Sequence, residues 1–277
     1  QADTTPNFNS PALRQSTDGY INSSSSNTDT DEFLTNLYFG KTYYWRVRAR
    51  NAVDTCAWST PWTFTTRNDV VMSSPVTGTN WWAGINLDWS THLGVSFYDM
   101  QADTVNTFNS AALRQSSDAY INSSSSNTDT DEYLTNIYFG KTYYWRVRAR
   151  NAVDTSAWAT PWNFSTRDYV VLSSPADNQL NINTAGINVD WASHHGIGFY
   201  QVQIDTTNQF NSPLLITANK GYINTVSSNS DTQHGTGGLL TNRWYFWRVR
   251  AINNVDTTAW TTRAFSTGST AIPNPAI

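Results

Sequence analysis

Carboxylate and amide side chains gather in one loop that the sequence contains twice, at 22–32 and 122–132. Such hard oxygen ligands are the ones that Ca²⁺ prefers. The glycine and spacing of an EF-hand are absent, and the third version of the loop has fewer carboxylates. We therefore expect a solvated loop between strands, with calcium binding as the alternative. The acidic candidates are Asp29, Asp31, Glu32, Asp129, Asp131 and Glu132.

Alternating arginines form a second candidate site, at Arg46, Arg48 and Arg50 and again in 146–150. They could bind a ligand as a charged stripe. Cross-strand pairing with Asp99 and Asp103 is the competing interpretation, because opposite charges on neighbouring strands stabilise a sheet. In the third copy Gln201 replaces Asp99 and Ile252 replaces Arg150, and this joint change favours pairing.

Tryptophans are the third candidate group. Trp81 and Trp82 lie in the turn expected between the first two strands of the second unit. We expect them to pack against the next unit, and a platform for a sugar ring is the alternative. A carbohydrate-binding role would require Trp81, Trp82, Trp62 or Trp162 to be exposed. The other tryptophans fit the cores of strands.

Four Asp-Thr steps fit a short bacterial O-glycosylation pattern, which would modify Thr4, Thr104, Thr206 and Thr257. No Gly-x-Ser-x-Gly elbow, phosphate-binding loop or paired-acid constellation appears in the sequence. His194 and His195 adjoin no cysteine or carboxylate at metal-ligand spacing. We therefore expect no catalytic residues and no cofactor.

The composition excludes two classes of partner. Charged residues make up 14% of the chain and the formal net charge is −4, so the basic footprint of a nucleic-acid-binding protein is absent. No apolar run approaches the ~20 residues of a membrane-spanning helix. Ser, Thr and Asn take the place of the missing charges, which predicts a neutral surface rich in hydroxyl groups.

A long internal repeat organises these candidates. Residues 43–55 recur unchanged at 143–155, and an edited copy occupies 245–257. Residues 1–75 and 101–175 align without a gap and differ at 15 positions. A repeat of this length is a whole domain, since solenoid repeats are 20–50 residues long.

The repeat frame predicts three units and a tail. Residues 1–67 form a partial unit that lacks its first two strands, 68–167 and 168–268 form complete units, and 269–277 form a linker or the start of a further unit. The partial unit is expected to be a window of a longer chain. The alternative is that a strand from another chain completes it.

Period-2 alternation indicates β-strands throughout. Tyr143, Trp145, Val147 and Ala149 define a core face in 143–149, and the arginines define the opposite face. Segments 97–103, 169–172, 187–191 and 158–166 are also expected to be strands. Several short strands per ~100 residues, separated by turn residues, are typical of a β-sandwich.

One set of residues resembles a known family: Leu37, Phe39, Gly40, Tyr43, Trp45, Val47 and Ala49. These residues are similar to the E–F corner and F strand of fibronectin type III domains, although Phe39 stands where proline is usual and Asn242 replaces the glycine in the third copy. The resemblance assigns Trp89 and Trp191 to strand B and Trp58, Trp158 and Trp260 to strand G. The repeats are similar to those of large bacterial surface and secreted proteins.

The resemblance implies an all-β chain of tandem immunoglobulin-like (fibronectin type III) sandwiches and brings no catalytic residues. We expect a stalk, spacer or fibre segment at the cell surface or in the extracellular medium. A carbohydrate-binding module and an accessory spacer of a secreted hydrolase are the alternatives. The expected partners are other domains of the same long chain, surface glycans or identical chains in a fibre.

Overall fold

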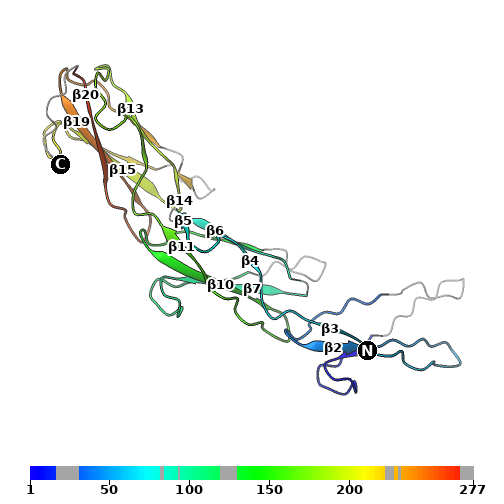
Figure 1. Ribbon diagram of the computed structural model, residues 1–277. Coiled ribbons are helices and arrows are strands. Elements are labelled where there is room, and N and C mark those ends of the chain that lie inside the picture. The colour runs from blue at the N-terminus through cyan, green and yellow to red at the C-terminus, as the bar shows by residue number, and fades with distance from the viewer. Residues whose placement is uncertain are drawn as a thin grey trace, which may run out of the picture.

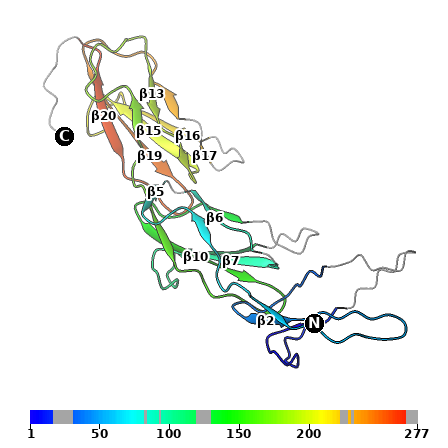
Figure 2. The same cartoon turned by 45° about the vertical axis from the view of Figure 1, so that its right-hand side comes forward.

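A computed structural model describes residues 1–16, 31–81, 84–92, 94–118, 130–221, 228–229 and 232–268. These residues form strands and turns and contain no helix. They fall into three units that lie in an elongated row, with unit 1 (1–67) and unit 3 (168–268) at opposite ends and unit 2 (68–167) between them (Figure 1). The turned view shows the same row (Figure 2). The described residues therefore offer no helix that could span a membrane.

Unit 2 contains two sheets, as predicted for a β-sandwich. One sheet has the order β4 (Met72–Ser74), β6 (Ile85–Trp89), β9 (Asp131–Leu134). The other has the order β5 (Thr79–Trp81), β11 (Trp162–Thr166), β10 (Thr142–Arg150), β7 (Phe97–Asp103), β8 (Arg114–Asp118).

Unit 3 repeats this arrangement. Its first sheet has the order β12 (Leu172–Ser174), β13 (Asn188–Trp191), β18 (Gln233–Gly235). Its second sheet has the order β16 (Ile216–Lys220), β15 (Phe199–Asp205), β19 (Trp244–Ile252), β20 (Thr261–Ser266). A short ladder also joins β14 (His194–His195) and β17 (Ser228–Asn229).

The predicted core face of the repeat is confirmed in β10. Trp145 and Val147 are 0% exposed and belong to the same cluster as Leu87 and Trp89 of the opposite sheet. The alternation follows from the pleat, which sends successive side chains to opposite faces. Trp89 is on β6 and is 3% exposed, so its prediction as a buried strand residue is also confirmed, although β5 precedes this strand in unit 2.

Each unit carries a tyrosine that closes the turn before the strand on which it lies. The Tyr143 hydroxyl accepts a hydrogen bond from the backbone N–H of Tyr138 at 3.0 Å. Tyr43 and Tyr245 accept the equivalent bonds at 2.9 Å and 2.8 Å. A tyrosine at this position, bonded back to the backbone upstream, is a hallmark of immunoglobulin-like sandwiches.

In unit 1 the described residues form one sheet, with the order β1 (Ala2–Asp3), β2 (Thr42–Trp45), β3 (Trp62–Thr65). Nothing among them covers the face that β6 covers in unit 2. Trp45 is therefore 38% exposed and Val47 61% exposed, whereas their counterparts Trp145 and Val147 are fully buried.

Three sequence predictions are wrong in detail. Segment 169–172 was expected to be a strand, yet β12 begins only at Leu172. Trp158 was expected in strand 158–166, yet β11 begins at Trp162, and Trp58 and Trp260 likewise precede β3 and β20. Asp103 was expected to pair with an arginine, yet it is 0% exposed and lies opposite Tyr144. Its carboxylate accepts bonds from Thr104 N–H at 2.6 Å and Ser110 N–H at 2.9 Å, because β7 ends there in a turn.

Hydrogen bonds keep this buried carboxylate ionised. Burial alone would raise the pKa of Asp103, but hydrogen bonds from Ser110 and Thr104 hold it below its ordinary value. Asp3 and Asp205 occupy the same turn in the other units and have the same lowered pKa for the same reasons.

The difference in burial between units 1 and 2 makes a testable prediction. Trp145→Ala should lower the unfolding free energy by roughly 3–5 kcal/mol, since it empties a filled core site. Trp45→Ala is the matched control at the same repeat position. The indole of Trp45 is partly exposed, so its truncation should lower the unfolding free energy by clearly less. Chemical denaturation followed by tryptophan fluorescence measures both variants, and equal costs would contradict the assigned burial.

Candidate functional site: the outer sheet face and the joints between units

The outer face of each larger sheet carries a stack of arginines and aromatic rings. In unit 2 the Arg146 guanidinium carbon lies 3.9 Å from the Phe108 ring centre and 4.5 Å from that of Trp158. Arg148 lies 4.4 Å from the same indole. Cation–π contacts of this kind stabilise most where the cation is partly desolvated.

The same stack recurs in the other units. Arg46 lies between Phe8 and Trp58, at 3.8 Å and 4.6 Å, and Arg248 lies between Phe210 and Trp260, at 3.9 Å and 4.4 Å. This explains why Trp58, Trp158 and Trp260 precede their strands. Their indoles cover arginines on the outer face, so they contribute nothing to the inner core.

A glutamine fixes the inner arginine of each stack. Arg146 donates from Nε and Nη2 to Gln101 Oε1 at 3.0 Å and 2.7 Å, and Arg46 makes the same pair of bonds to Gln1. The phenylalanine below takes a left-handed backbone conformation, with φ of 55° at Phe108. Bulky residues rarely adopt this conformation, so the surrounding contacts must hold it.

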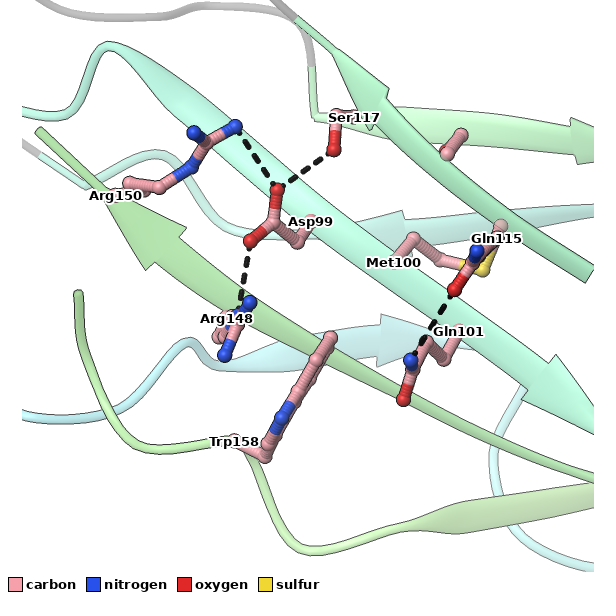
Figure 3. A pocket seen from close by; sticks show the side chains of 9 residues that line it. Asp99, Met100, Gln101, Gln115, Ser117, Arg148, Arg150 and Trp158 are labelled. Atoms are coloured by element: carbon pink, nitrogen blue, oxygen red, sulfur yellow. Dashed lines mark hydrogen bonds and ion pairs between the residues drawn. The ribbon is translucent and has the colours of Figure 1, made fainter. Parts of the chain in front are cut away.

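Asp99 pairs with the two outer arginines of unit 2, which confirms that part of the sequence prediction. Its carboxylate lies 2.9 Å from Arg148 Nε and 3.2 Å from Arg150 Nη2, and Ser117 donates to it at 2.7 Å (Figure 3). Burial alone would raise the pKa of Asp99. The hydrogen bonds from Ser117 and Arg148 and the charge of Arg150 outweigh burial and hold the pKa below its ordinary value.

These residues line an open pocket of about 490 Å³ on the outer face, together with Gln101, Gln115 and Trp158 (Figure 3). The carboxylate in the pocket is held ionised by two arginines, which makes it a weak base. The indole of Trp158 is already flanked by Arg146 and Arg148. The pocket therefore offers hydrogen-bond donors and acceptors and lacks a group poised to move a proton.

The ends of the units carry a second set of polar contacts, which sequence reasoning missed. The loop Asn151–Asp154 of unit 2 reaches the turn 36–39 of unit 1. Asn151 Nδ2 donates to the Leu37 carbonyl at 2.8 Å, and the Phe39 N–H donates to Asp154 Oδ2 at 2.8 Å. We call this loop the plug and the turn the socket.

Unit 3 docks on unit 2 through the same atoms. Asn253 Nδ2 donates to the Ile137 carbonyl at 2.9 Å, and the Phe139 N–H donates to Asp256 Oδ2 at 2.9 Å. Each joint contains one further bond between units, from Ala152 N–H to Asn36 in the first joint and from Asn254 N–H to Asn136 in the second. Within units 2 and 3, Ala157 N–H donates to Asn68 and Ala259 N–H donates to Asp168, which holds the first residue of each unit beside its plug.

Two features shape the first joint around these bonds. Gly40 has a φ of 61°, and a Cβ there would lie 2.9 Å from that of Asn68, so glycine lets the linker residue pack against the turn. Phe39 is buried and its ring lies 5.7 Å from that of His92 in unit 2, edge to face. Gly140 and Asp168 repeat the close approach in the second joint.

A pattern within the repeat could have revealed the plug. All three copies keep Asn, Val, Asp and Thr at the same spacing, as in Asn51–Thr55, although the third copy changes many other polar positions. The pattern alone does not show which atoms the plug meets, because the socket atoms are mostly backbone.

The predicted calcium ligands are not gathered by the described part of the chain. Asp29 and Asp129 lie outside the described residues. Asp31 and Glu32 are exposed, and Asp131 lies opposite Asp88 in the β6–β9 ladder. Burial and the charge of Asp131 raise the pKa of Asp88. The described residues contain no group of three His, Cys, Asp or Glu side chains that could hold a metal, and calcium binding stays a prediction.

The aromatic and threonine candidates are only partly placed. Trp81 was expected in a turn, but it is the last residue of β5 and lies opposite Thr166 of β11. Its side chain and all of Trp82 lie outside the described residues. Thr4, Thr104 and Thr206 are half-buried in the turns after Asp3, Asp103 and Asp205. Thr257 is exposed and follows Asp256 in the plug of unit 3. Their glycosylation stays a prediction.

Comparison with known proteins adds little beyond the fold. No protein-family model and no curated protein matches the chain. Two solved structures are similar to it. One is the FN1–FN3 domains of chicken CNTN1, at 16% identity over 82% of this chain and 76% of that one, with a TM-score of 0.28. The other is a segment of two fibronectin type III domains from chicken tenascin, at 14% identity over 72% and 98%, with a TM-score of 0.29.

The fold assignment rests on the strands of this chain, since such loose superpositions support no finer statement. The two sheets of units 2 and 3, the tyrosine at each E–F corner and the buried Trp89 and Trp191 define an all-β chain of tandem fibronectin type III-like sandwiches.

The ion pairs of Asp99 make a testable prediction, because unit 3 has a neutral residue at the same position. Asp99→Gln copies Gln201, the residue of unit 3 that accepts from Arg250 at 2.8 Å. Both arginines are more than a third exposed, so water screens their charges. The unfolding free energy of the variant should therefore be lower by about 1 kcal/mol or less at neutral pH.

The pH dependence of this loss has a defined sign. The folded pKa of Asp99 is depressed, so its contribution is complete above the unfolded pKa of about 3.9 and disappears as the pH falls through the folded pKa. Urea unfolding of the protein and the variant at a series of pH values measures the difference. A difference that persists or grows in acid would contradict the assignment.

Proposed function

We propose that the chain is a non-catalytic spacer array that holds its units at fixed relative orientations, at a cell surface or in the extracellular medium. One observation carries the proposal: the same three hydrogen bonds connect equivalent atoms of neighbouring units in both joints. Flexible linkers would not require two joints to agree atom for atom.

The joint chemistry favours a stiff connection. The sockets present backbone groups, whose positions are set by the turn, and the plugs present an amide and a carboxylate. A hydrogen bond to an ionised carboxylate is stronger than one between neutral groups. Asn68 and Asp168 are the first residues of units 2 and 3 and accept bonds from Ala157 and Ala259 of the same units, so each linker is fixed to the unit that follows it.

The outer faces support a structural role as well. The arginine stacks repeat in all three units, and a glutamine accepts a hydrogen bond from the inner arginine of each stack. A repeated glycan platform has less support. Trp62 is 70% exposed, but Trp162 at the same position is half-buried against Trp145, so the repeat does not present the same aromatic surface twice.

Distance measurements across the first joint test the proposal. Spin labels at the exposed positions Thr60 and Thr160, placed in a Cys56→Ser background because Cys56 is free and exposed, report the separation of units 1 and 2. The unmodified joint should give one narrow distance distribution. N151A/D154A removes the two hydrogen bonds that these side chains make to unit 1, worth about 1–3 kcal/mol, and should broaden the distribution.

The same double substitution in unit 1, N51A/D54A, is the matched control. That plug meets no other unit among the described residues, so the distribution should stay narrow. A broad distribution in the parent protein, or one unchanged by N151A/D154A, would contradict a joint held by these bonds.

A further inference from the structure

The pocket on the outer face of unit 2 contains residues that the sheet itself does not require. Unit 3 replaces three of them, with Gln201 for Asp99, Ile252 for Arg150 and Thr217 for Gln115. Its strand β15 nevertheless pairs with β19 over its whole length. The charged residues of the unit 2 pocket are therefore available for a ligand.

The surface that this pocket offers to a ligand is positively charged. Among the described residues that line it, Asp99 alone is acidic, and its side chain is only 11% exposed. The side chains of Arg148 and Arg150 are 35% and 39% exposed. Arg146 adds a further positive charge beside Arg148, and burial together with that neighbouring charge lowers the pKa of Arg146. A ligand that enters the pocket therefore meets guanidinium groups before it meets the carboxylate.

The free hydrogen-bonding groups of the arginines are all donors. The carboxylate of Asp99 already accepts from Arg148, Arg150 and Ser117. Within the described residues, both Nη atoms of Arg148 and Nη1 of Arg150 have no hydrogen-bond partner. Guanidinium N–H groups match the oxygens of a carboxylate, and hydrogen bonds between ionised groups are stronger than neutral ones. The pocket is therefore suited to a ligand that carries an anionic oxygen group.

The rest of the pocket lining suits a sugar ring. Gln115 is exposed, and its side chain makes only a long contact of 3.4 Å, in which its Oε1 accepts from Gln101 Nε2 (Figure 3). An amide of this kind can both donate to and accept from hydroxyl groups. Trp158 lines the same pocket and is half-buried, so part of its indole is open to a ligand. The volume of about 490 Å³ lies within the range of about 300–1,000 Å³ that is usual for ligand pockets.

We propose that this pocket binds a uronic acid residue of an acidic polysaccharide. Arg148 and Arg150 donate to the carboxylate of the sugar, while Gln115 and the indole of Trp158 contact its ring. A carboxylate is favoured over a sulfate ester because each oxygen of Asp99 already meets one of these two arginines, which shows that their spacing fits a planar carboxylate. A neutral sugar would leave the guanidinium donors without an ionised partner.

An NMR titration of the whole chain with a tetrasaccharide of galacturonic acid tests the site. The indole N–H signal of Trp158 is the reporter, because this side chain lines the pocket. The signal should shift until the site is saturated. A tetrasaccharide of galactose, which lacks the carboxylates, and sodium sulfate at the same ionic strength should both leave it in place.

Variants that copy unit 3 test the residues separately, and unit 3 shows that the sheet accepts each replacement. R150I removes a charged donor and should raise the dissociation constant about tenfold or more. Q115T should raise it by a smaller factor. D99Q removes the negative charge of the pocket and should lower it. R243I is the control, because it removes a positive charge from an exposed position of unit 3 and should leave the dissociation constant unchanged.

Three results would overturn the proposal. The first is an indole signal that the acidic tetrasaccharide does not move. The second is an equal shift with the neutral tetrasaccharide or with sulfate, which would show an adventitious contact only. The third is a dissociation constant that R150I leaves unchanged or that D99Q raises. The spin-label distances across the first joint do not depend on this pocket, so the spacer role and the sugar site can fail separately.

Discussion

The arrangement of the units depends on the need of buried backbone groups for partners. At each joint a carbonyl and an N–H of the preceding turn, those of Leu37 and Phe39 in the first joint, are covered by the next unit. An unpaired buried peptide group costs about as much as a lost hydrogen bond. Asn151 and Asp154 supply the partners only at one relative orientation, and this couples the geometry of the row to two side chains per joint.

Polar groups also find partners within each unit. The core of the sandwich comes from alternating aromatic and aliphatic side chains, and the outer face is closed by guanidinium groups stacked on aromatic rings. Charged residues are scarce, and the arginines of the three stacks lie against aromatic rings. The result is a unit whose sides carry satisfied polar groups, while its ends carry the groups that recognise another unit.

Sequence reasoning succeeded where a local period determined the outcome. The faces of β10, the strand assignment of Trp89 and the pairing of Asp99 with arginines all follow from alternation and charge. It failed for Asp103, whose burial depends on a turn that bends Ser110 back onto it. It failed for Trp158, whose partner is a cation on the neighbouring strand. It missed the joints because their socket atoms are backbone groups brought together only by the folded turn.

Residual dipolar couplings of units 2 and 3 in one weakly aligned sample test the central claim most directly. If the bonds of Asn253 and Asp256 hold the second joint, a single alignment tensor should fit the couplings of both units in the relative orientation of the structure. Tensors that differ in magnitude between the two units would show independent motion and would contradict the account.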